Sequence, residues 1–393
     1  MTHETPKQIF TKPFARRLSH AMVMILTFFS VCIGGALVSL LAVSPGTPIP
    51  FRDHSGKLLL AGISEKRFVT INGARQGMFI RGMDKTKPVL LFLHGGPGMP
   101  EFAISQKYPT VLEEHFVVCW WEQRGSGLSF SPNIPPSTMN AAQLVSDTLA
   151  VTNYLQSSFG QDKIYLMAHS GGSFFGIQAA SQAPQLYHAY IGVAQISWQL
   201  ASEKRAYSYM VEQFTKGGND DMVAKLTAIP LPQMDVMPPA YAKLRDEAMH
   251  SLGIGTTHKM RSVVRGIFMP IMLSPAYTMG EKINIWRGKW SEASTYLWSN
   301  ILATDLTVTV RKLDVPVYFI SGIYDHTVSY ALAKDYFKKL EAPVKGFYTF
   351  KNSAHSPLFE EPERFGRVLK QDVLTGTTTL ADAITPHGGV PKP

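Results

Sequence analysis

A serine at the end of an apolar run is the sharpest chemical signal in this chain. A run typical of a buried strand leads into AHSGG, the five residues centred on Ser170. A strand that turns sharply into a helix at a serine exposes the hydroxyl above the sheet, where it can attack a carbonyl carbon. The turn needs small residues two before and two after the serine, and Ala168 and Gly172 meet that need. The competing Ser173 would place the bulky Phe175 at its +2 position, so the pattern favours Ser170 as nucleophile.

A second signal is the glycine-rich sequence HGGPG, which begins at His94 directly after the apolar run 89–93. A loop in that position can direct backbone N–H groups at the oxyanion formed during acyl transfer, together with the N–H that follows the nucleophile. We therefore expect Gly96 and Gly171 to form the oxyanion hole, with Gly95 as the alternate donor. Phosphate binding by this loop is excluded, because the glycine spacing matches neither of the common phosphate-binding patterns.

A nucleophilic serine also needs a base to take its proton and an acid to orient the base. Asp325 stands just past an apolar run at 316–323, and His355 stands in a loop after the run 347–350. The order serine, acid, histidine is the one found in hydrolases with a serine turn of this kind. His326 is the rival base, but it adjoins Asp325, and adjacent residues cannot easily face each other. The sequence predicts that Ser170 attacks, His355 moves the proton and Asp325 orients His355.

These residues must be positioned by elements that alternate along the chain. Apolar runs have the length and composition of buried strands at 89–93, 116–121, 164–167, 190–193, 317–320 and 347–350. Helical patterns occupy 140–155, the stretch after Ser170, and 359–370. Asn72-Gly73 lies between alternating apolar residues, which is typical of an antiparallel hairpin. The pattern predicts an α/β fold with a mostly parallel sheet flanked by helices, extended by one hairpin.

The stretch 197–305 breaks this alternation with helical patterns, several Met and Trp residues and proline-rich joints. We interpret it as a helical cap inserted into the sheet domain. The expected parts of the chain are an N-terminal tail 1–20, a transmembrane anchor 21–43, a linker 44–56, a first core part 57–196, the cap 197–305, a second core part 306–375 and a flexible tail 376–393.

The anchor prediction rests on 21–43, which contains no charged residue, preceded by Lys7, Lys12, Arg16 and Arg17. Such a run is long enough to span a bilayer as one helix. The basic flank predicts a cytoplasmic N-terminus and an external catalytic domain. A cleaved secretion signal is the competing interpretation, and it would release a protein that begins near Ser44. The Pro- and Gly-rich linker is expected to decouple this segment from the domain, so that a chain beginning near Pro50 folds by itself.

The composition narrows the function further. The formal net charge is +9, but Lys and Arg are scattered, so nucleic-acid binding is not indicated. Two cysteines, Cys32 and Cys119, cannot form a disulfide scaffold, and no Cys/His cluster suggests zinc. No metal or organic cofactor is implied, and the sequence indicates no oligomeric state.

Residues 64–196 and 306–373 resemble α/β-hydrolases, and more narrowly the prolyl aminopeptidase (proline iminopeptidase) branch. The resemblance rests on HGGPG from His94 and on EQRGSGLS from Glu122, which is similar to that branch's DQRGxGxS segment with Glu122 in place of Asp. It implies that Arg124 is buried and fixes loops around the site, and that 197–305 corresponds to the family's helical cap.

The sequence also departs from that branch. AHSGG stands where GGSWG is typical, and the cap lacks the W-x-x-W-E pattern whose glutamate binds the free amine of the substrate. Acids of the cap that could take this role are Glu203, Glu212, Glu281 and Glu292.

Three functions stay open from the sequence. The first is an aminopeptidase-like serine hydrolase of small-molecule or short peptide substrates. The second is a carboxylesterase or lipase, with an acyl pocket formed by Phe268, Met269, Met272 and Trp286. The third is a non-catalytic binding protein, which the intact Ser, Asp and His set disfavours. Dehalogenase and epoxide hydrolase chemistry would need an acid at position 170, so Ser170 excludes them.

Overall fold

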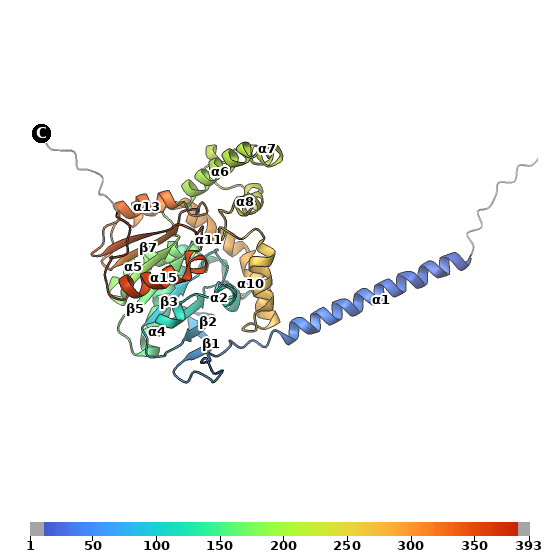
Figure 1. Ribbon diagram of the computed structural model, residues 1–393, viewed down its shortest axis with the longest axis horizontal. Helices are drawn as coiled ribbons and strands as arrows, with labels where there is room; N and C mark the ends of the chain where they lie inside the picture. Colours follow the sequence, from blue (N-terminus) through green and yellow to red (C-terminus); the bar gives the residue numbers. More distant parts are fainter. Residues whose placement is uncertain (1–11, 384–393) are drawn as a thin grey trace, which may run out of the picture.

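One mixed sheet of eight strands forms the centre of the protein (Figure 1), in the order β1-β2-β4-β3-β5-β6-β7-β8. The structure is a computed structural model, and it describes residues 12–383, without the side chains of residues 12–21, 33, 36 and 37. The strands are β1 (Ile63–Ile71), β2 (Ala74–Gly82), β3 (Val89–Leu93), β4 (Val117–Glu122), β5 (Ile164–His169), β6 (Tyr187–Val193), β7 (Val317–Gly322) and β8 (Lys345–Phe350). Strands β3 to β8 pair in parallel, whereas β1 and β2 are antiparallel. The predicted mostly parallel sheet with one hairpin is confirmed.

The sheet is covered by helices on both faces, which explains why its central strands are continuously apolar. Val89, Leu91 and Leu93 of β3 belong to one buried cluster, and Leu90 and Phe92 belong to the other, because successive side chains point to opposite faces. The helices of the sheet domain are α2 (Phe102–Lys107), α3 (Leu112–His115), α4 (Ala141–Phe159), α5 (Gly171–Gln182), α12 (Leu306–Thr309), α13 (Tyr330–Lys339), α14 (Pro357–Glu360) and α15 (Pro362–Val368). Shorter 3₁₀ or π turns are η1 (Gly127–Ser129), η2 (Pro136–Thr138), η3 (Pro184–Leu186) and η6 (Leu369–Val373).

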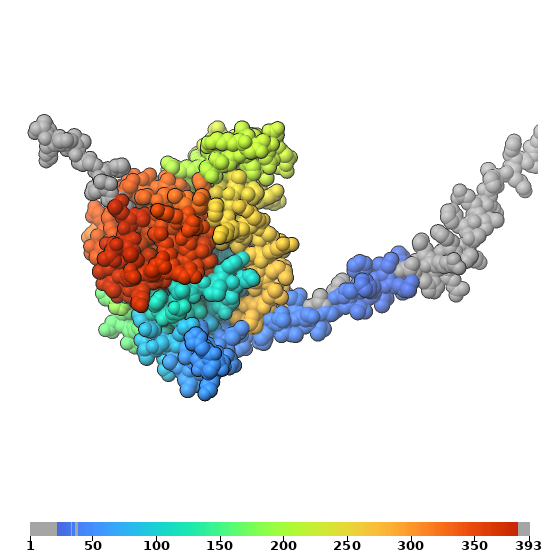
Figure 2. Space-filling view, viewed as in Figure 1, coloured from blue at the N-terminus to red at the C-terminus, as the bar shows by residue number. Residues whose placement is uncertain are grey.

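The stretch between β6 and α12 is helical and forms a lobe beside the sheet domain (Figure 2). Its elements are α6 (Gln199–Lys216), α7 (Asp220–Thr227), η4 (Leu231–Gln233), α8 (Pro239–Leu252), η5 (Val264–Phe268), α9 (Met269–Leu273), α10 (Met279–Lys289) and α11 (Glu292–Ala303). Its two ends meet where Trp198 pairs with Asp305 and the N–H of Leu306 donates to the carbonyl of Ser197 at 2.8 Å. A separate apolar cluster, which includes Met210 and Tyr241, lets the helices α6 to α8 pack on one another.

The N-terminal helix differs from the sequence prediction. α1 (Lys12–Ala42) begins well before the expected boundary at residue 21 and projects away from the sheet domain (Figure 1). Lys and Arg are good helix formers, so the described residues of the basic flank, Lys12, Arg16 and Arg17, belong to the helix. Within the described part of the chain, no helix is both long enough and apolar enough to cross a membrane. The expected transmembrane anchor over 21–43 is therefore not supported, and residues 1–11 lie outside the described residues.

The expected linker 44–56 is in contact with the cap. The N–H groups of Gly46 and Thr47 donate to the carbonyl of Pro275 at 3.0 and 3.1 Å. The buried ammonium of Lys282 in α10 donates to Ser44 Oγ at 2.6 Å and to the carbonyl of Val43 at 3.3 Å. The expected decoupling is wrong, because these residues supply acceptors to a buried cation that has one other acceptor, the carbonyl of Met272 at 2.8 Å.

A chain that begins at Pro50 is therefore expected to be less stable than one that begins at Ser39. The shorter chain removes Val43 and Ser44 and leaves the Lys282 ammonium, whose pKa burial already lowers, with fewer acceptors. An unpaired buried donor costs about 1–3 kcal/mol. Thermal unfolding of both chains measures the difference. Lys282→Met in both chains should shrink it, and equal melting temperatures of the unsubstituted pair would contradict the prediction.

The C-terminal part of the chain also differs from the sequence prediction in two places. The helix expected over 359–370 is divided into α14 and α15, because Pro362 has no N–H for the helix that precedes it. The expected flexible tail from 376 is attached to the domain at its start. The N–H of Asp382 donates to the carbonyl of Phe347 at 2.8 Å, and Thr379 Oγ1 donates to Asp372 Oδ1 at 2.5 Å. Residues 384–393 lie outside the described residues.

Candidate active site

Ser170 occupies a strained turn between β5 and α5. Its φ is 52°, in the left-handed region that non-glycine residues seldom adopt. A Cβ at Gly172 would lie 2.5 Å from the carbonyl oxygen of Leu93, so the turn tolerates no side chain there. Ser173 is fully buried: its Oγ donates to the Ser170 carbonyl at 2.6 Å and accepts from the N–H of Ile196 at 2.9 Å. Ser173 is therefore engaged in fixing the turn.

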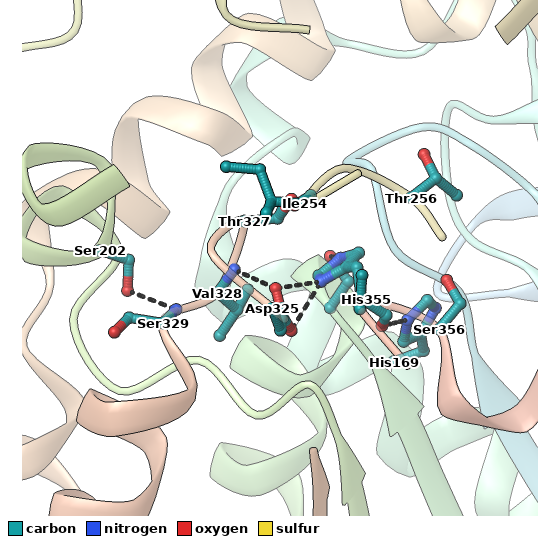
Figure 3. Close-up of polar contacts among 12 residues, drawn as sticks. His169, Ser202, Ile254, Thr256, Asp325, Thr327, Val328, Ser329, His355 and Ser356 are labelled. Carbon is teal, nitrogen blue, oxygen red and sulfur yellow. Dashed lines mark hydrogen bonds and ion pairs between the residues drawn. The ribbon is translucent and has the colours of Figure 1, made fainter. Parts of the chain in front are cut away.

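The structure brings Ser170, His355 and Asp325 together. Ser170 Oγ lies 2.7 Å from His355 Nε2. His355 Nδ1 lies 3.0 and 3.1 Å from the two carboxylate oxygens of Asp325 (Figure 3). A carboxylate only accepts hydrogen bonds, so Nδ1 carries a proton and Nε2 of the neutral ring can accept from the serine hydroxyl. The N–H of Val328 donates to Asp325 Oδ1 at 2.9 Å and helps to orient the acid.

The rival histidine lies elsewhere. The ring of His326 stacks on Tyr209 of α6, with ring centroids 3.9 Å apart. It lines a cavity of about 530 Å³ that also reaches Asp325. The other lining residues include Lys204 and Arg205 of the cap. His326 thus contributes to the wall of that cavity, while His355 faces the serine.

The expected oxyanion donors stand beside each other. A Cβ at Gly171 would lie 3.4 Å from the backbone nitrogen of Gly96, so the two backbones approach closely. Gly96 has φ 120°, a conformation open to glycine. The N–H of Gly95 donates to Glu101 Oε1 at 2.8 Å, so this alternate donor is already used. Within residues 12–383, the N–H of Gly96 has no hydrogen-bond partner, and Gly171 opens α5, where the first N–H groups lack intrahelical partners.

His94 links the HGGPG loop to the segment after β4. Its Nε2 accepts from the N–H of Gln123 at 3.1 Å, and Gln123 Nε2 donates to the His94 carbonyl at 2.8 Å. Its Nδ1 donates to the carbonyl of Gly95 at 2.8 Å. Burial lowers the pKa of His94, which agrees with a neutral ring that accepts at Nε2.

Glu122 and Arg124, which belong to the second motif (EQRGSGLS), are both buried. Arg124 Nε lies 2.6 Å from Asp147 Oδ2 of α4, and Arg124 Nη2 donates to the carbonyl of Asn72 at 3.1 Å. Arg124 thus ties the β1–β2 hairpin to α4. Glu122 accepts from the N–H of Leu128 at 2.6 Å and from the hydroxyl of Tyr277 in the cap, and burial raises the pKa of Glu122 to about 8.

A second contact between the cap and the sheet domain lies next to His355, the expected catalytic base. Glu360 Oε1 accepts from the N–H of Ala354, which precedes His355, at 3.0 Å. Its other oxygen accepts from the N–H of His258 in the cap at 2.6 Å. Close to Asp325, Thr327 Oγ1 donates to the carbonyl of the cap residue Ile254 at 3.4 Å (Figure 3). The cap is therefore linked through Glu360 to the loop that carries the expected base.

Two residues near Ser170 were missed by the sequence reasoning. His169 Nδ1 lies 2.9 Å from both carboxylate oxygens of Glu101, and both side chains are buried. The one signal in the sequence was that an ionisable residue, His169, directly precedes the expected nucleophile Ser170. The sequence could not show that an acid after the HGGPG loop would face it.

Most of the candidate amine-binding acids are already paired. Glu203 is fully buried against Arg245, with Glu203 Oε2 2.6 Å from Arg245 Nε. Glu281 pairs with Lys66 at 2.8 Å, and Glu212 pairs with Lys216 at 2.5 Å. Glu292 is exposed in the first turn of α11.

Of the four expected acyl-pocket residues, Phe268 and Trp286 line a surface groove, whereas Met269 and Met272 do not. Phe268 and Trp286, with ring centroids 5.2 Å apart, line an apolar groove with Phe130 and Trp290. No residue of the Ser170, Asp325 and His355 set lines this groove. Of the described residues, no group of three His, Cys, Asp or Glu side chains is arranged to hold a metal ion.

Comparison with known proteins agrees with this fold. The sequence profile of the α/β hydrolase fold family matches residues 88–362. The chain is 31% identical over 306 residues to a Bacillus subtilis protein named "Probable aminopeptidase YbaC", covering 77% of this chain and 94% of that protein. The chain therefore belongs to the α/β hydrolase fold family.

More distant relatives point to the branch that the motifs resemble. The proline iminopeptidase of Thermoplasma volcanium is 22% identical over 315 residues, covering 78% of this chain and 96% of that protein. The solved structure of a proline iminopeptidase from Mycobacterium smegmatis superposes with a TM-score of 0.56 at 14% identity, over 79% of this chain and 98% of that chain. At that identity the solved structure shows the shared fold alone.

Proposed function

We propose that the protein is a serine hydrolase, proline iminopeptidase-like, that cleaves small amide or ester substrates through an acyl-enzyme. The observation that carries the proposal is the continuous hydrogen-bonded chain from Ser170 Oγ through His355 to Asp325, at 2.7 and 3.0 Å. A serine hydroxyl is a weak nucleophile unless an adjacent base accepts its proton in the attack.

In the proposed mechanism, His355 Nε2 takes the hydroxyl proton while Ser170 Oγ attacks the substrate carbonyl. The negative charge that develops on the carbonyl oxygen is stabilised by the N–H groups of Gly96 and Gly171. His355 then gives its proton to the leaving amine or alcohol, and the acyl-enzyme forms. Water, deprotonated by the same ring, attacks the acyl-enzyme. The ester bond to Ser170 Oγ then breaks, His355 returns the proton to Oγ, and the carboxylic acid product leaves. Asp325 stabilises the imidazolium in both halves of the reaction.

The substrate class is proposed from the relatives. Both curated relatives carry aminopeptidase-type names, which favours an N-terminal amide bond as the cleaved bond. A carboxylesterase activity is the second candidate, and one observation favours it. Glu203, the fully buried acid of α6, is neutralised by Arg245 and is not free for the ammonium group of a peptide substrate.

A substrate panel separates these functions. The panel contains aminoacyl-arylamides with a free amine, the same arylamides with the amine acetylated, and p-nitrophenyl esters. For an aminopeptidase we expect acetylation to lower kcat/KM by about 10²-fold or more, because a site that pairs with a polar group rejects an analogue that lacks it. Fast ester cleavage and no effect of acetylation would establish the esterase instead. No turnover of any member would support a non-catalytic binding protein and overturn the proposal.

A further inference from the structure

We propose that His169 and Glu101 form a buried positioning pair that holds the nucleophile, the oxyanion loop and the base loop in register. This proposal rests on the proposed function. The pair contacts none of the reacting atoms, so its effect on the rate would be exerted through Ser170, Gly96 and His355.

The contacts of the pair join three loops that are distant in sequence. Glu101 Oε1 accepts from the N–H of Gly95 at 2.8 Å, which fixes the loop that carries Gly96. His169 directly precedes Ser170, and its Nδ1 lies 2.9 Å from Glu101. Its Nε2 donates to the backbone carbonyl of His355 at 2.9 Å (Figure 3). The side chains of His169 and Glu101 together therefore bind the ends of β3, β5 and β8.

Both nitrogens of His169 donate, because a carboxylate and a carbonyl can only accept. The ring is therefore an imidazolium, and the pair is ionic. Burial by itself opposes the charge, but the adjacent Glu101 carboxylate raises the pKa of His169 above its ordinary value. In return, and also against burial, His169 holds the pKa of Glu101 below its usual range. The other titratable groups that face the pair are Asp325 and His355 beside His169, and His94 beside Glu101.

Displacement of the loops that the pair joins is expected to lower kcat. Each residue that the pair anchors adjoins or carries a group of the proposed reaction: Gly95 adjoins Gly96, His169 adjoins Ser170, and His355 carries the base. A displacement of about 1 Å from productive geometry can cost on the order of 10²-fold in rate. Loss of the Glu101 carboxylate removes the acceptor of the Gly95 N–H and the charge that keeps the buried His169 ring protonated.

Two substitutions of Glu101 test the proposal. Glu101→Ala removes both contacts and is expected to lower kcat by about 10²-fold with little change in KM, because positioning rather than substrate binding is lost. Glu101→Gln keeps an acceptor for the Gly95 N–H and offers its amide N–H to the bare Nδ1 of a neutral His169. We expect Glu101→Gln to restore kcat to within about 10-fold of wild type, since both contacts persist.

The pH profile supplies a second readout. His169 has a raised pKa in the folded protein, so the ion pair persists below that pKa and is lost as pH rises through it. The wild-type kcat should decline as pH rises through that pKa, because a neutral ring keeps one N–H and can donate to only one of the Glu101 carboxylate and the His355 carbonyl. In Glu101→Gln the ring is already neutral, so this decline should be absent.

Glu113→Ala is the matched control. Glu113 also accepts from a buried cation, with Glu113 Oε1 2.9 Å from Arg81 Nε, but the pair lies where β4 begins, at the edge of the sheet opposite Ser170. The kcat of Glu113→Ala should equal that of the wild-type protein. Wild-type kcat in Glu101→Ala, or an unchanged decline of kcat with rising pH in Glu101→Gln, would overturn the proposal. If Glu101→Ala does not fold, the pH profile of Glu101→Gln decides.

Failure of the proposed function would be recognised separately. In that case the wild-type protein itself would turn over no substrate of the panel, and Ser170 would not be labelled by a fluorophosphonate. An active, labelled wild type with unaffected Glu101 variants would contradict the positioning pair alone.

Discussion

Replacing Ser170 with alanine is expected to lower kcat by about 10⁶-fold, because loss of the nucleophile in a serine hydrolase removes the acyl-enzyme pathway. The fold should persist. The alanine retains Cβ, and the turn is also held by the Ser173 hydroxyl, which donates to the carbonyl of residue 170. Hydrolysis of the best substrate of the panel, together with the melting temperature, measures both effects.

Ser173→Ala is the control for the register of the turn. Ser173 Oγ accepts from the N–H of Ile196, so its loss leaves a buried donor unpaired and should cost about 1–3 kcal/mol of stability. The serine is not expected to take part in the reaction, so kcat should stay near wild type. An inactive Ser173→Ala beside an active Ser170→Ala would show that the nucleophile was assigned to the wrong serine.

The second large effect is expected at His355 and Asp325. His355→Ala should cost about as much as loss of the nucleophile, because the residues of such a set act as a unit. Asp325→Asn should leave the structure intact but cost about 10⁴-fold in kcat, since the amide can donate to Nδ1 and then favours the wrong tautomer. The double variant Ser170→Ala, His355→Ala should be scarcely slower than either single variant.

His326→Ala serves as the control for this pair of substitutions. His326 adjoins Asp325 in sequence, but its ring stacks on Tyr209 and not on the serine. We expect His326→Ala to leave kcat within a few-fold of wild type. A loss as large as that of His355→Ala would contradict the assignment of His355 as base.

Several features of the site were predictable because they are local. The small residues around Ser170 are required by the turn itself: a side chain at position 172 would meet the carbonyl of Leu93. Asp325 and His355 could be placed because the carboxyl ends of parallel strands meet at one edge of the sheet, so loops that follow different strands converge there. The structure locates both residues at that edge, with His355 between Ser170 and Asp325.

The boundaries of the terminal segments were less predictable. The extension of α1 to the N-terminal side of residue 21 depends on how far a helix continues into a polar flank that also has high helix propensity. The segment 44–56 looks like a free linker by composition, yet the backbone N–H groups of Gly46 and Thr47 donate to the carbonyl of Pro275 in the cap. Composition predicts how a segment behaves in isolation. The hydrogen bonds to Pro275 depend on which part of the cap packs beside the segment in the folded protein.

The sequence by itself determined the α/β architecture and the strand ends that carry Ser170, Asp325 and His355, because those depend on periodicity and on local steric limits. The tertiary structure decided which charges meet. Glu203 and Arg245 lie 42 residues apart, and Glu101 and His169 lie 68 apart, so neither pairing leaves a periodic trace in the chain. Whether an acid is free for a substrate amine or neutralised in the interior depends on what is buried against it, because an unpaired charge is strongly disfavoured away from water.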